Sequence, residues 1–419
     1  MRPLILLACL GIGANAAASD AYFFDVPLLP ATSYLSHQLT VGIGSGAFHR
    51  PGDPSPLVWT CTDRGPNADF KNGKQYPLPE FAPSIYALWA HRNGARVIAH
   101  IPLSDRAGLP LSGLSNPLSA PALSEAAYGP TGALLAPDPA GIDIEALVKL
   151  GDGSFWLADE NAPSLLHVDA NGRVLRRLVP DGVAASLAGA QSRYDIAGTL
   201  PRILRLRRVN RGFEAIAVAP GDAVLYTALQ SPLDHPANSA KPTPSPRLSR
   251  TVRLLRVDSA SGAATAEWAY DCERFTDFHD PVALNPNPKQ GDVKISELVA
   301  VDADRLIVLE RTDFKAKLFL VDLRVPATDL LGSRWDDEAT RPTLEQIDLA
   351  HPGVGDPILP LSKTLIFDQD VDCPEIPGKI EGVALINPST IMLINDNDFA
   401  IGGERTVITF VVLPPRARH

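Results

Sequence analysis

The amino-acid sequence predicts an all-β fold, a propeller-like array of antiparallel sheets with five to seven blades. Three observations favour it: the composition, a hairpin plan that recurs along the chain, and the place of the acids in each hairpin. The 419 residues include 39 Pro and 31 Gly, a share above the ~12% that is usual in soluble proteins. So many breaks favour short strands and turns over long helices.

The composition also bounds the partners. Apolar residues make up 45% of the chain, enough for a sizeable core, although aromatic residues make up only 6%. The chain has 38 basic and 48 acidic residues, a formal net charge of −10. Because an acidic chain is poorly suited to nucleic acid or anionic membranes, we expect no nucleic-acid partner. A small-molecule substrate and a monomer are also expected. No later stretch reaches the ~18 apolar residues of a membrane span.

The first residues are typical of a signal peptide. A positive residue, Arg2, precedes an apolar run that ends at Gly13, and Ala14-Asn15-Ala16 offers a small-x-small cleavage site. We therefore expect a signal peptide at 1–18, one propeller domain at 19–419, and export to the periplasm or the medium. A buried N-terminal helix is the alternative interpretation.

Three cysteines follow the predicted signal peptide, namely Cys61, Cys272 and Cys373. An oxidising compartment permits one disulfide bond and leaves one free thiol. We expect Cys272 to pair with Cys373. The spacing does not fit a zinc site.

The repeated plan decides the fold. Each copy has a glutamate near the start of an apolar strand, a turn, a second apolar strand, and a polar group at its end. An antiparallel hairpin folds those two points together, so each copy brings its glutamate and its terminal group to one edge. The opening glutamates are Glu145, Glu214, Glu297 and Glu381, and a weaker copy runs from Ser45 to Gly65.

The spacing of the copies leaves room for further strands. The opening glutamates lie 69, 83 and 84 residues apart, more than the ~40–50 residues of one four-stranded blade. Residues 165–169, 253–258 and 318–322 have the pattern of outer strands, and a radial array of such sheets limits exposed edges. Three stretches, 102–139, 233–250 and 324–359, read as surface excursions, some of which could cover the site.

The acids of all copies would meet near the axis of a closed ring. Carboxylates within ~4–6 Å raise one another's pKa unless cations lie between them, and oxygen ligands of this kind suit Ca²⁺, or less often Mg²⁺. For any single acid, a hydrogen bond from a backbone N–H is the alternative. The candidate metal ligands are Glu145, Glu214, Glu297, Glu381, Asp143, Glu310, Asp396 and Asp398.

Other charged residues beside these acids are candidates for catalysis. Asp159 or Glu160 could act as a general base, and Asp63 ends the weaker copy. The arginines at the same strand ends could hold an anionic group, because guanidinium forks match phosphate or carboxylate oxygens. They are Arg64, Arg211 and Arg311, and salt bridges are the alternative interpretation.

Several familiar catalytic and nucleotide-binding motifs are missing from the sequence. There is no Gly-x-Ser-x-Gly elbow of a serine esterase, no phosphate-binding P-loop and no dinucleotide fingerprint. Gly42, Gly44 and Gly46 have the wrong spacing for such a fingerprint.

Seven segments, in order along nearly the whole chain after residue 18, resemble the bacterial phytase-like family, described as esterase-like activity of phytase. The resemblance implies a propeller-like fold, export, and hydrolysis of phosphate or other esters. The chain departs from the family at Ala146 and Ala215, where glycine is usual after the glutamate. The segments are Thr62 to Pro66, Asp143 to Ala146, Phe155 to Glu160, Asn210 to Glu214, Leu309 to Arg311, Lys379 to Gly382, and Asn395 to Phe399.

Three functions follow from this interpretation. The first is a metal-dependent hydrolase of phosphate esters or related esters, with Ca²⁺ as the expected cofactor. The second is a Ca²⁺-dependent lactonase or carboxylesterase. The third is a non-catalytic binding module in which Ca²⁺ only holds the blades together.

Overall fold

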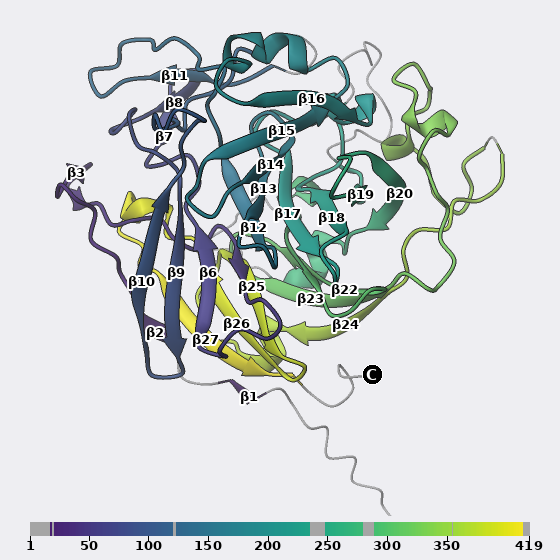
Figure 1. The fold of residues 1–419 in the computed structure, drawn as a ribbon. Helices are drawn as coiled ribbons and strands as arrows, with labels where there is room; N and C mark the ends of the chain where they lie inside the picture. The colour runs from purple at the N-terminus through teal and green to yellow at the C-terminus, as the bar shows by residue number, and fades with distance from the viewer. Residues whose placement is uncertain are drawn as a thin grey trace, which may run out of the picture.

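Five sheets lie around a common axis in the part of the chain that the structure describes (Figure 1). The structure is a computed structural model, and it describes residues 17–18, 21–119, 123–234, 248–279, 289–353 and 355–413. The five sheets follow one another along the chain and are called blades 1 to 5. The prediction of a β-propeller is therefore confirmed, with five blades among the described residues.

The strands of each blade run from the axis outward in an almost regular order. Blade 1 contains β5 (Ala47–Phe48), β6 (Leu57–Cys61), β9 (Ser84–His91) and β10 (Gly94–Pro102). Blade 2 contains β12 (Ile144–Lys149), β13 (Phe155–Asp159), β14 (Ser164–Val168), β15 (Val174–Pro180) and β16 (Asp195–Leu200). Blade 3 contains β17 (Phe213–Val218), β18 (Val224–Leu229), β19 (Thr251–Asp258) and β20 (Ala264–Asp271). Blade 4 contains β21 (Lys294–Ala300), β22 (Arg305–Arg311), β23 (Ala316–Asp322) and β24 (Lys363–Asp368).

Blade 5 is built from both ends of the described chain. Its strands β25 (Ile380–Asn387), β26 (Thr390–Asn395) and β27 (Val407–Val412) are joined by β1 (Ala17–Ala18) and β2 (Tyr22–Phe23). Both of these early strands pair antiparallel with β27, so that Tyr22 lies opposite Ile408. This pairing closes the ring, because the sheet that ends the propeller also holds its first strands.

The predicted hairpins form the inner half of each blade. The pairs β12–β13, β17–β18, β21–β22 and β25–β26 are antiparallel, and the weaker copy forms β5 and β6. The predicted outer strands are β14, β19 and β23. The innermost strands contact one another in the order β5, β12, β17, β21, β25 and back to β5.

The hydrophobic core lies between neighbouring blades. Trp156 on β13 and Phe213 on β17 belong to one apolar cluster and are fully buried, and Trp59 on β6 contacts Phe155 on β13 edge to face. Each fully buried apolar side chain of this size contributes roughly 1.5–3 kcal/mol. Since the sheets are apolar on both faces, polar side chains are left to the strand ends, where the site forms.

A small three-stranded sheet stands beside blades 1 and 2. Its strands are β7 (Ala68–Phe70), β8 (Gly73–Gln75) and β11 (Ala126–Tyr128), with β11 parallel to β8. It takes in part of the predicted excursion 102–139, and a separate hairpin joins β3 (Ser33–Tyr34) to β4 (His37–Gln38). The α-helix α1 (Gln369–Asp372) is four residues long. The 3-10 helices are Ala184–Ala190, Arg202–Leu206, Phe275–Phe278, Gln290–Asp292, Arg334–Asp336, Leu344–Gln346 and Asp398–Ala400.

The structure corrects the predicted disulfide bond and does not describe most of the predicted signal peptide. Cys61, Cys272 and Cys373 are all free and buried, so the expected Cys272–Cys373 disulfide is wrong. Each thiol belongs to the apolar packing of its own blade or loop and has no sulfur partner there. The predicted signal peptide lies outside the described residues, except for Ala17 and Ala18. Among the described helices, none is long and apolar enough to cross a membrane.

Candidate functional site

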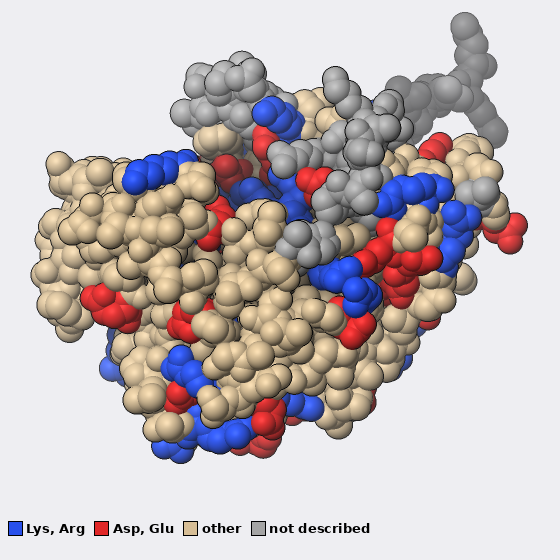
Figure 2. All heavy atoms as spheres, turned by 90° about the horizontal axis from the view of Figure 1, so that it is seen from above, with Lys and Arg blue, Asp and Glu red and all other residues tan. Residues whose placement is uncertain are grey.

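A polar cavity of about 230 Å³ lies where the inner hairpins of the blades end. Seven carboxylates, six cationic side chains and three amides line it, so positive and negative groups alternate within a small volume. Both signs also lie beside one another on the face seen from above in Figure 2. The lining residues are Asp63, Arg64, Asn67, Lys74, Glu145, Glu160, Asn210, Arg211, Glu214, Gln230, Lys294, Arg311, Lys379, Glu381, Asp396 and Asp398.

Two larger hollows of the surface are lined by other residues. A groove of about 1050 Å³ beside blade 3 is lined by residues such as Phe275, Ile358 and Leu359. A second cavity, of about 520 Å³, is lined by turns of blades 3, 4 and 5 and by apolar residues such as Phe48 and Leu298. Neither gathers the acids and bases of the repeats, so the smaller polar cavity is the candidate site.

A β-bulge turns the glutamates into this cavity. In each of four inner hairpins the pairing register skips one residue near the start of the inner strand. A bulge leaves the additional residue unpaired and redirects its side chain. The skipped residues are Glu145, Glu214, Ser296 and Glu381.

The bulge shows that the prediction of Glu297 as the fourth equivalent glutamate is wrong by one position. Ser296, not Glu297, is the equivalent of the three other glutamates, and Glu297 does not line the cavity. The Glu297 side chain is 1% exposed, and its Oε2 accepts the backbone N–H of Ala47 at 2.9 Å. A Cβ atom at Gly46 would lie 3.4 Å from that same oxygen, so Glu297 fills space between the innermost strands of blades 4 and 1.

The small residues after the glutamates are explained by the same packing. A Cβ atom at Gly46 would lie 2.8 Å from Cα of Ala146, and one at Gly382 would lie 2.9 Å from Cβ of Ala47. Real Cβ atoms do not approach so closely without displacing the backbone. The innermost strands therefore pack closely at these positions, where Gly46 and Gly382 have no side chain. Ala146, where the family usually has glycine, adds one methyl group to this packing.

The second strand of each inner hairpin supplies the other half of the cavity. Asp159, Leu229, Glu310 and Asn395 lie opposite the starts of the inner strands. Successive side chains of a strand point to opposite sides, so it is the next residue in each case that lines the cavity. These next residues are Glu160, Gln230, Arg311 and Asp396.

Two predicted site residues are directed away from the cavity by that alternation. Asp159 lies 2.8 Å from Arg177 through its Oδ2 atom, and both side chains are fully buried. Glu310 accepts a hydrogen bond from the Tyr270 hydroxyl at 2.6 Å and pairs with Lys363 at 2.6 Å. Both carboxylates are thus committed to contacts between strands. Asp159 also accepts the backbone N–H of Asp143 at 3.4 Å, but neither Asp159 nor Glu310 lines the cavity.

Three carboxylates form a compact cluster at the side of blades 1 and 2. Asp63, Asp143 and Glu145 each offer an oxygen atom, and these atoms lie within 4.8 Å of one another. Burial and the charges of Asp396 and Asp143 raise the pKa of Asp63 well above its usual value. Burial, followed by the charge of Asp143, does the same to the pKa of Glu145. Carboxylates this close cannot all stay ionised without a compensating cation.

The protein itself compensates this cluster only in part. Arg64 donates its backbone N–H to Asp143 at 3.2 Å, and its guanidinium lies 3.5 Å from the other Asp143 oxygen. That oxygen, Oδ2, is buried and accepts no hydrogen bond. Among the described residues, no side chain pairs with the carboxylate of Glu145. Unsatisfied, hard oxygen atoms of this kind fit a Ca²⁺ or Mg²⁺ ion.

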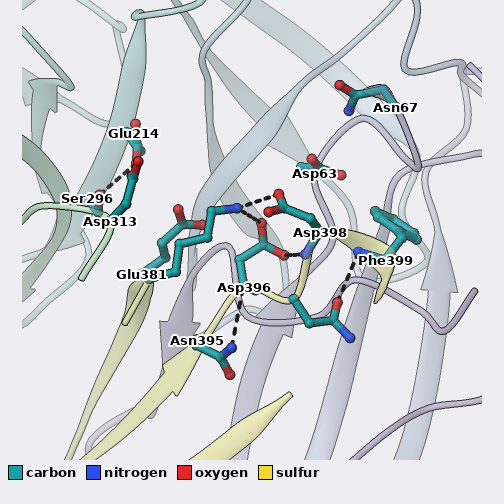
Figure 3. A network of polar contacts seen from close by, with 12 residues as sticks. Asp63, Asn67, Glu214, Ser296, Asp313, Glu381, Asn395, Asp396, Asp398 and Phe399 are labelled. Carbon is teal, nitrogen blue, oxygen red and sulfur yellow. Dashed lines mark hydrogen bonds and ion pairs between the residues drawn. The ribbon is translucent and has the colours of Figure 1, made fainter. Parts of the chain in front are cut away.

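The remaining predicted ligands are already neutralised by side chains. Arg311 lies 3.1 Å from Glu214 and also bonds Glu381 and the hydroxyl of Ser296. Lys379 lies 3.0 Å from Asp396 and also pairs with Asp398. Figure 3 shows these acids among their polar contacts, with Glu214 beside Ser296 and Asp396 beside Asp398.

A chain of polar contacts joins blades 2 and 3 across the cavity. Arg211 donates to Oε1 of Gln230, and Nε2 of Gln230 donates to Oε1 of Glu160 at 2.6 Å. Burial, and then the charges of Glu214 and Asp143, raise the pKa of Glu160 well above its usual value. Gln230 was not predicted as a site residue. The signal was its place at the strand end, where other repeats carry an acid.

Further lining residues were also outside the predicted set. Lys74 lies on β8 of the small sheet, Asn67 directly precedes β7, and Asn210 precedes β17 with a left-handed backbone (φ of 52°). Lys294 opens β21 and bonds Asp313 at 2.9 Å. Lys74 and Asn67 lie between the repeats in sequence, so the hairpin pattern could not single them out.

Comparison with known proteins places the chain in a family. A sequence model of the phytase-like family, described as esterase-like activity of phytase, matches residues 52–399. An uncharacterized secreted protein of Arthroderma benhamiae is 24% identical over 168 residues, which cover 36% of this chain and 31% of that protein. This chain therefore aligns with less than a third of that relative's length.

Solved structures of similar shape have low identity. Regucalcin of Agrobacterium tumefaciens, a calcium-binding protein, is 12% identical over 89% of this chain and 92% of its own, with a TM-score of 0.36. The PQQ-bound aldose sugar dehydrogenase of Streptomyces coelicolor is 8% identical over 95% and 96%, with a TM-score of 0.34. Similarity at this level has no bearing on the chemistry of the cavity.

Proposed function

The chain belongs to the phytase-like family, and from that membership we propose that it hydrolyses esters, phosphate esters above all. The proposed place of the reaction is the polar cavity described above, called the axial cavity from here on, and the reaction would use a divalent cation. Ca²⁺ is the proposed cofactor, with Mg²⁺ second. The observation that carries the proposal is the Asp63, Asp143 and Glu145 cluster, with oxygen atoms within 4.8 Å of one another. Asp143 and Glu145 retain carboxylate capacity that the described protein groups do not fill.

The three carboxylates would hold the cation. When bound, it would polarise an oxygen of the ester and make a water molecule more acidic. It would also reverse the local sign of charge, which otherwise repels an anionic substrate. Asp63 comes from the end of blade 1, and Asp143 and Glu145 come from the start of blade 2, so two blades contribute to the ligand set.

Glu160 is the proposed general base. Its Oε1 atom is held by Gln230 at 2.6 Å, which leaves its other oxygen to accept a proton from water. A base works best when its pKa lies near the working pH, and burial raises the pKa of Glu160 in that direction. Asp159 forms a buried ion pair with Arg177, so we propose a structural role for it instead.

The remaining parts of the proposal concern the whole protein. We propose that residues 1–18 direct export, that residues 19–419 form the working domain, and that the monomer acts on a small molecule. A relative described as secreted supports export. No membrane span occurs among the described helices.

A second candidate is favoured by the position of the acidic cluster. Because it joins blade 1 to blade 2, a bound Ca²⁺ could stabilise the ring without any catalysis. The chain would then be a binding module. Lactone or carboxylic ester hydrolysis is a third candidate that uses the same cluster.

An assay with and without chelator separates these candidates. The purified protein is incubated with p-nitrophenyl phosphate, bis-p-nitrophenyl phosphate, phytate and a panel of lactones, each with Ca²⁺ or with EDTA. The proposal expects Ca²⁺-dependent release of phosphate that Glu160→Gln abolishes. Absence of turnover on every substrate, together with a large drop in melting temperature in EDTA, would leave only the structural role.

A further inference from the structure

Most cations that line the axial cavity already face a carboxylate. Five of the six lining lysines and arginines each form an ion pair with at least one acid, which reduces the charge that a ligand would meet. The pairs are Lys74 with Asp69, Arg64 with Glu125 and Asp143, Lys294 with Asp313, Lys379 with Asp396 and Asp398, and Arg311 with Glu214 and Glu381.

Arg211 is the exception among these lining cations. Its guanidinium donates to the side-chain oxygen of Gln230, a neutral amide. In the described part of the chain it forms no ion pair. Arg211 therefore keeps a charge that is not cancelled by direct contact, together with donors that a ligand could use.

Gln230 fixes that arrangement. An arginine can only donate hydrogen bonds, so the Oε1 atom of Gln230 must face Arg211 and its Nε2 atom must face Glu160. The Gln230 side chain is 4% exposed, which holds the amide in this orientation. The equivalent strand ends of blades 2 and 5 carry Glu160 and Asp396, and an acid in place of Gln230 would neutralise Arg211.

We propose that Arg211 binds the anionic group of the substrate and that Gln230 positions the Arg211 side chain. The inference rests on the proposed function, in that the axial cavity is taken as the substrate site. It narrows the substrate to esters that carry an anionic group, of which phosphate is the one proposed, because a guanidinium fork matches phosphate or carboxylate oxygens. A cavity of about 230 Å³ holds roughly eight water volumes, enough for one phosphoryl group and a few further atoms.

Binding of phenylphosphonate, which cannot be hydrolysed, tests the inference without any turnover. Isothermal titration at saturating Ca²⁺ compares the wild type with Arg211→Gln, Arg211→Lys and Gln230→Glu. Arg92→Gln, in the exposed turn between β9 and β10, is the matched control. Melting temperatures of all variants identify any that do not fold.

The wild type and Arg92→Gln are expected to bind alike. Arg211→Gln should bind about tenfold more weakly or worse, as expected for the loss of a charge-assisted contact. Arg211→Lys should fall between them, and it replaces Arg211→Gln if that variant does not fold. Gln230→Glu should weaken binding by a similar factor although the guanidinium is still present, which a purely structural role for Gln230 does not predict.

Two results would overturn the inference. One is a wild-type protein that does not bind phenylphosphonate, and the other is an Arg211→Gln variant that binds it as tightly as the wild type. Arg211-dependent binding by a protein that hydrolyses no ester would refute the proposed hydrolase function and would still support Arg211 as the anion-binding residue. Turnover of phosphate esters that is unchanged in Arg211→Gln would support the hydrolase function and refute the role of Arg211.

Discussion

Oε2 of Glu297 accepts the backbone N–H of Ala47 at 2.9 Å, although the two residues are 250 positions apart in the chain. Glu297 stands on the inner strand of blade 4 and Ala47 on the inner strand of blade 1. The other Glu297 oxygen accepts the N–H of Leu298 at 3.2 Å. One buried carboxylate therefore satisfies two backbone groups of innermost strands.

Removal of this carboxylate should destabilise the ring. Glu297→Ala leaves the buried N–H of Ala47 without an acceptor, and unsatisfied buried donors cost about 1–3 kcal/mol each. With the cavity that the truncation creates, we expect urea denaturation to show a loss of about 2–4 kcal/mol in the free energy of unfolding. Glu80→Ala, at an exposed position, should change it by less than about 0.5 kcal/mol. A Glu297→Ala protein as stable as the wild type would refute this role.

Asp159 and Glu160 are neighbours with different expected roles. Asp159→Asn should lower the free energy of unfolding by about 3 kcal/mol, because it leaves Arg177 buried without its counter-charge. The turnover of the folded protein on p-nitrophenyl phosphate should hardly change. Glu160→Gln should do the opposite, keeping the melting temperature and lowering kcat by about 10²–10⁴. If Asp159→Asn abolished turnover in folded protein, the assignment of the base would be wrong.

Binding of Ca²⁺ should be coupled to release of protons. Burial raises the folded-state pKa of Asp63, Asp143 and Glu145 above the ordinary values of 3.8, 3.8 and 4.5. The metal-free fold therefore holds protons that the unfolded chain has lost, so its stability falls as the pH rises above those ordinary values. Ca²⁺ competes with the protons, so its affinity should fall as the pH is lowered.

Titration calorimetry in two buffers of different ionisation enthalpy measures the protons released per Ca²⁺ bound. Melting curves in EDTA between pH 5 and 8 should show falling stability, and Ca²⁺ should restore more of it at pH 8 than at pH 5. Affinity that is independent of pH throughout this range would contradict a site made of these carboxylates.

The three described cysteines should behave as buried thiols. Burial raises the pKa of Cys61 and Cys272 well above the usual value, and raises that of Cys373 to about 12. A thiol reagent should therefore label none of the three in the native protein and all of them in denaturant. Prior reduction should leave that labelling unchanged. An additional thiol exposed by reduction would show that a disulfide forms in the protein.

The sequence predicted the architecture because each inner hairpin carries its own turn and strand pattern. The five copies became five blades, and most of the acids at their ends line one cavity. Those local signals do not depend on distant contacts. The pairing of β2 with β27, by contrast, joins residues almost 400 positions apart, and no repeat pattern marks it.

The errors in the predicted site come from single-residue shifts. A bulge places Ser296, and not Glu297, at the position equivalent to the three other glutamates, and strand alternation turns Asp159 and Glu310 away from the cavity. A shift of one residue reverses the side to which a side chain points. The partners that neutralise Glu214, Glu381 and Asp396 are set by packing between blades, which lies beyond a motif in one segment.

The cation site at Asp63, Asp143 and Glu145 can be tested by calcium titration of the wild type and of Glu145→Gln. Glu145 belongs to the acidic cluster and has no described partner side chain, so its replacement removes a ligand without stranding a cation. We expect saturable Ca²⁺ binding by the wild type, binding weakened about tenfold or more in Glu145→Gln, and no change in the exposed control Glu404→Gln. A wild type that binds no Ca²⁺, or equal affinity in wild type and Glu145→Gln, would refute a cation site at the acidic cluster.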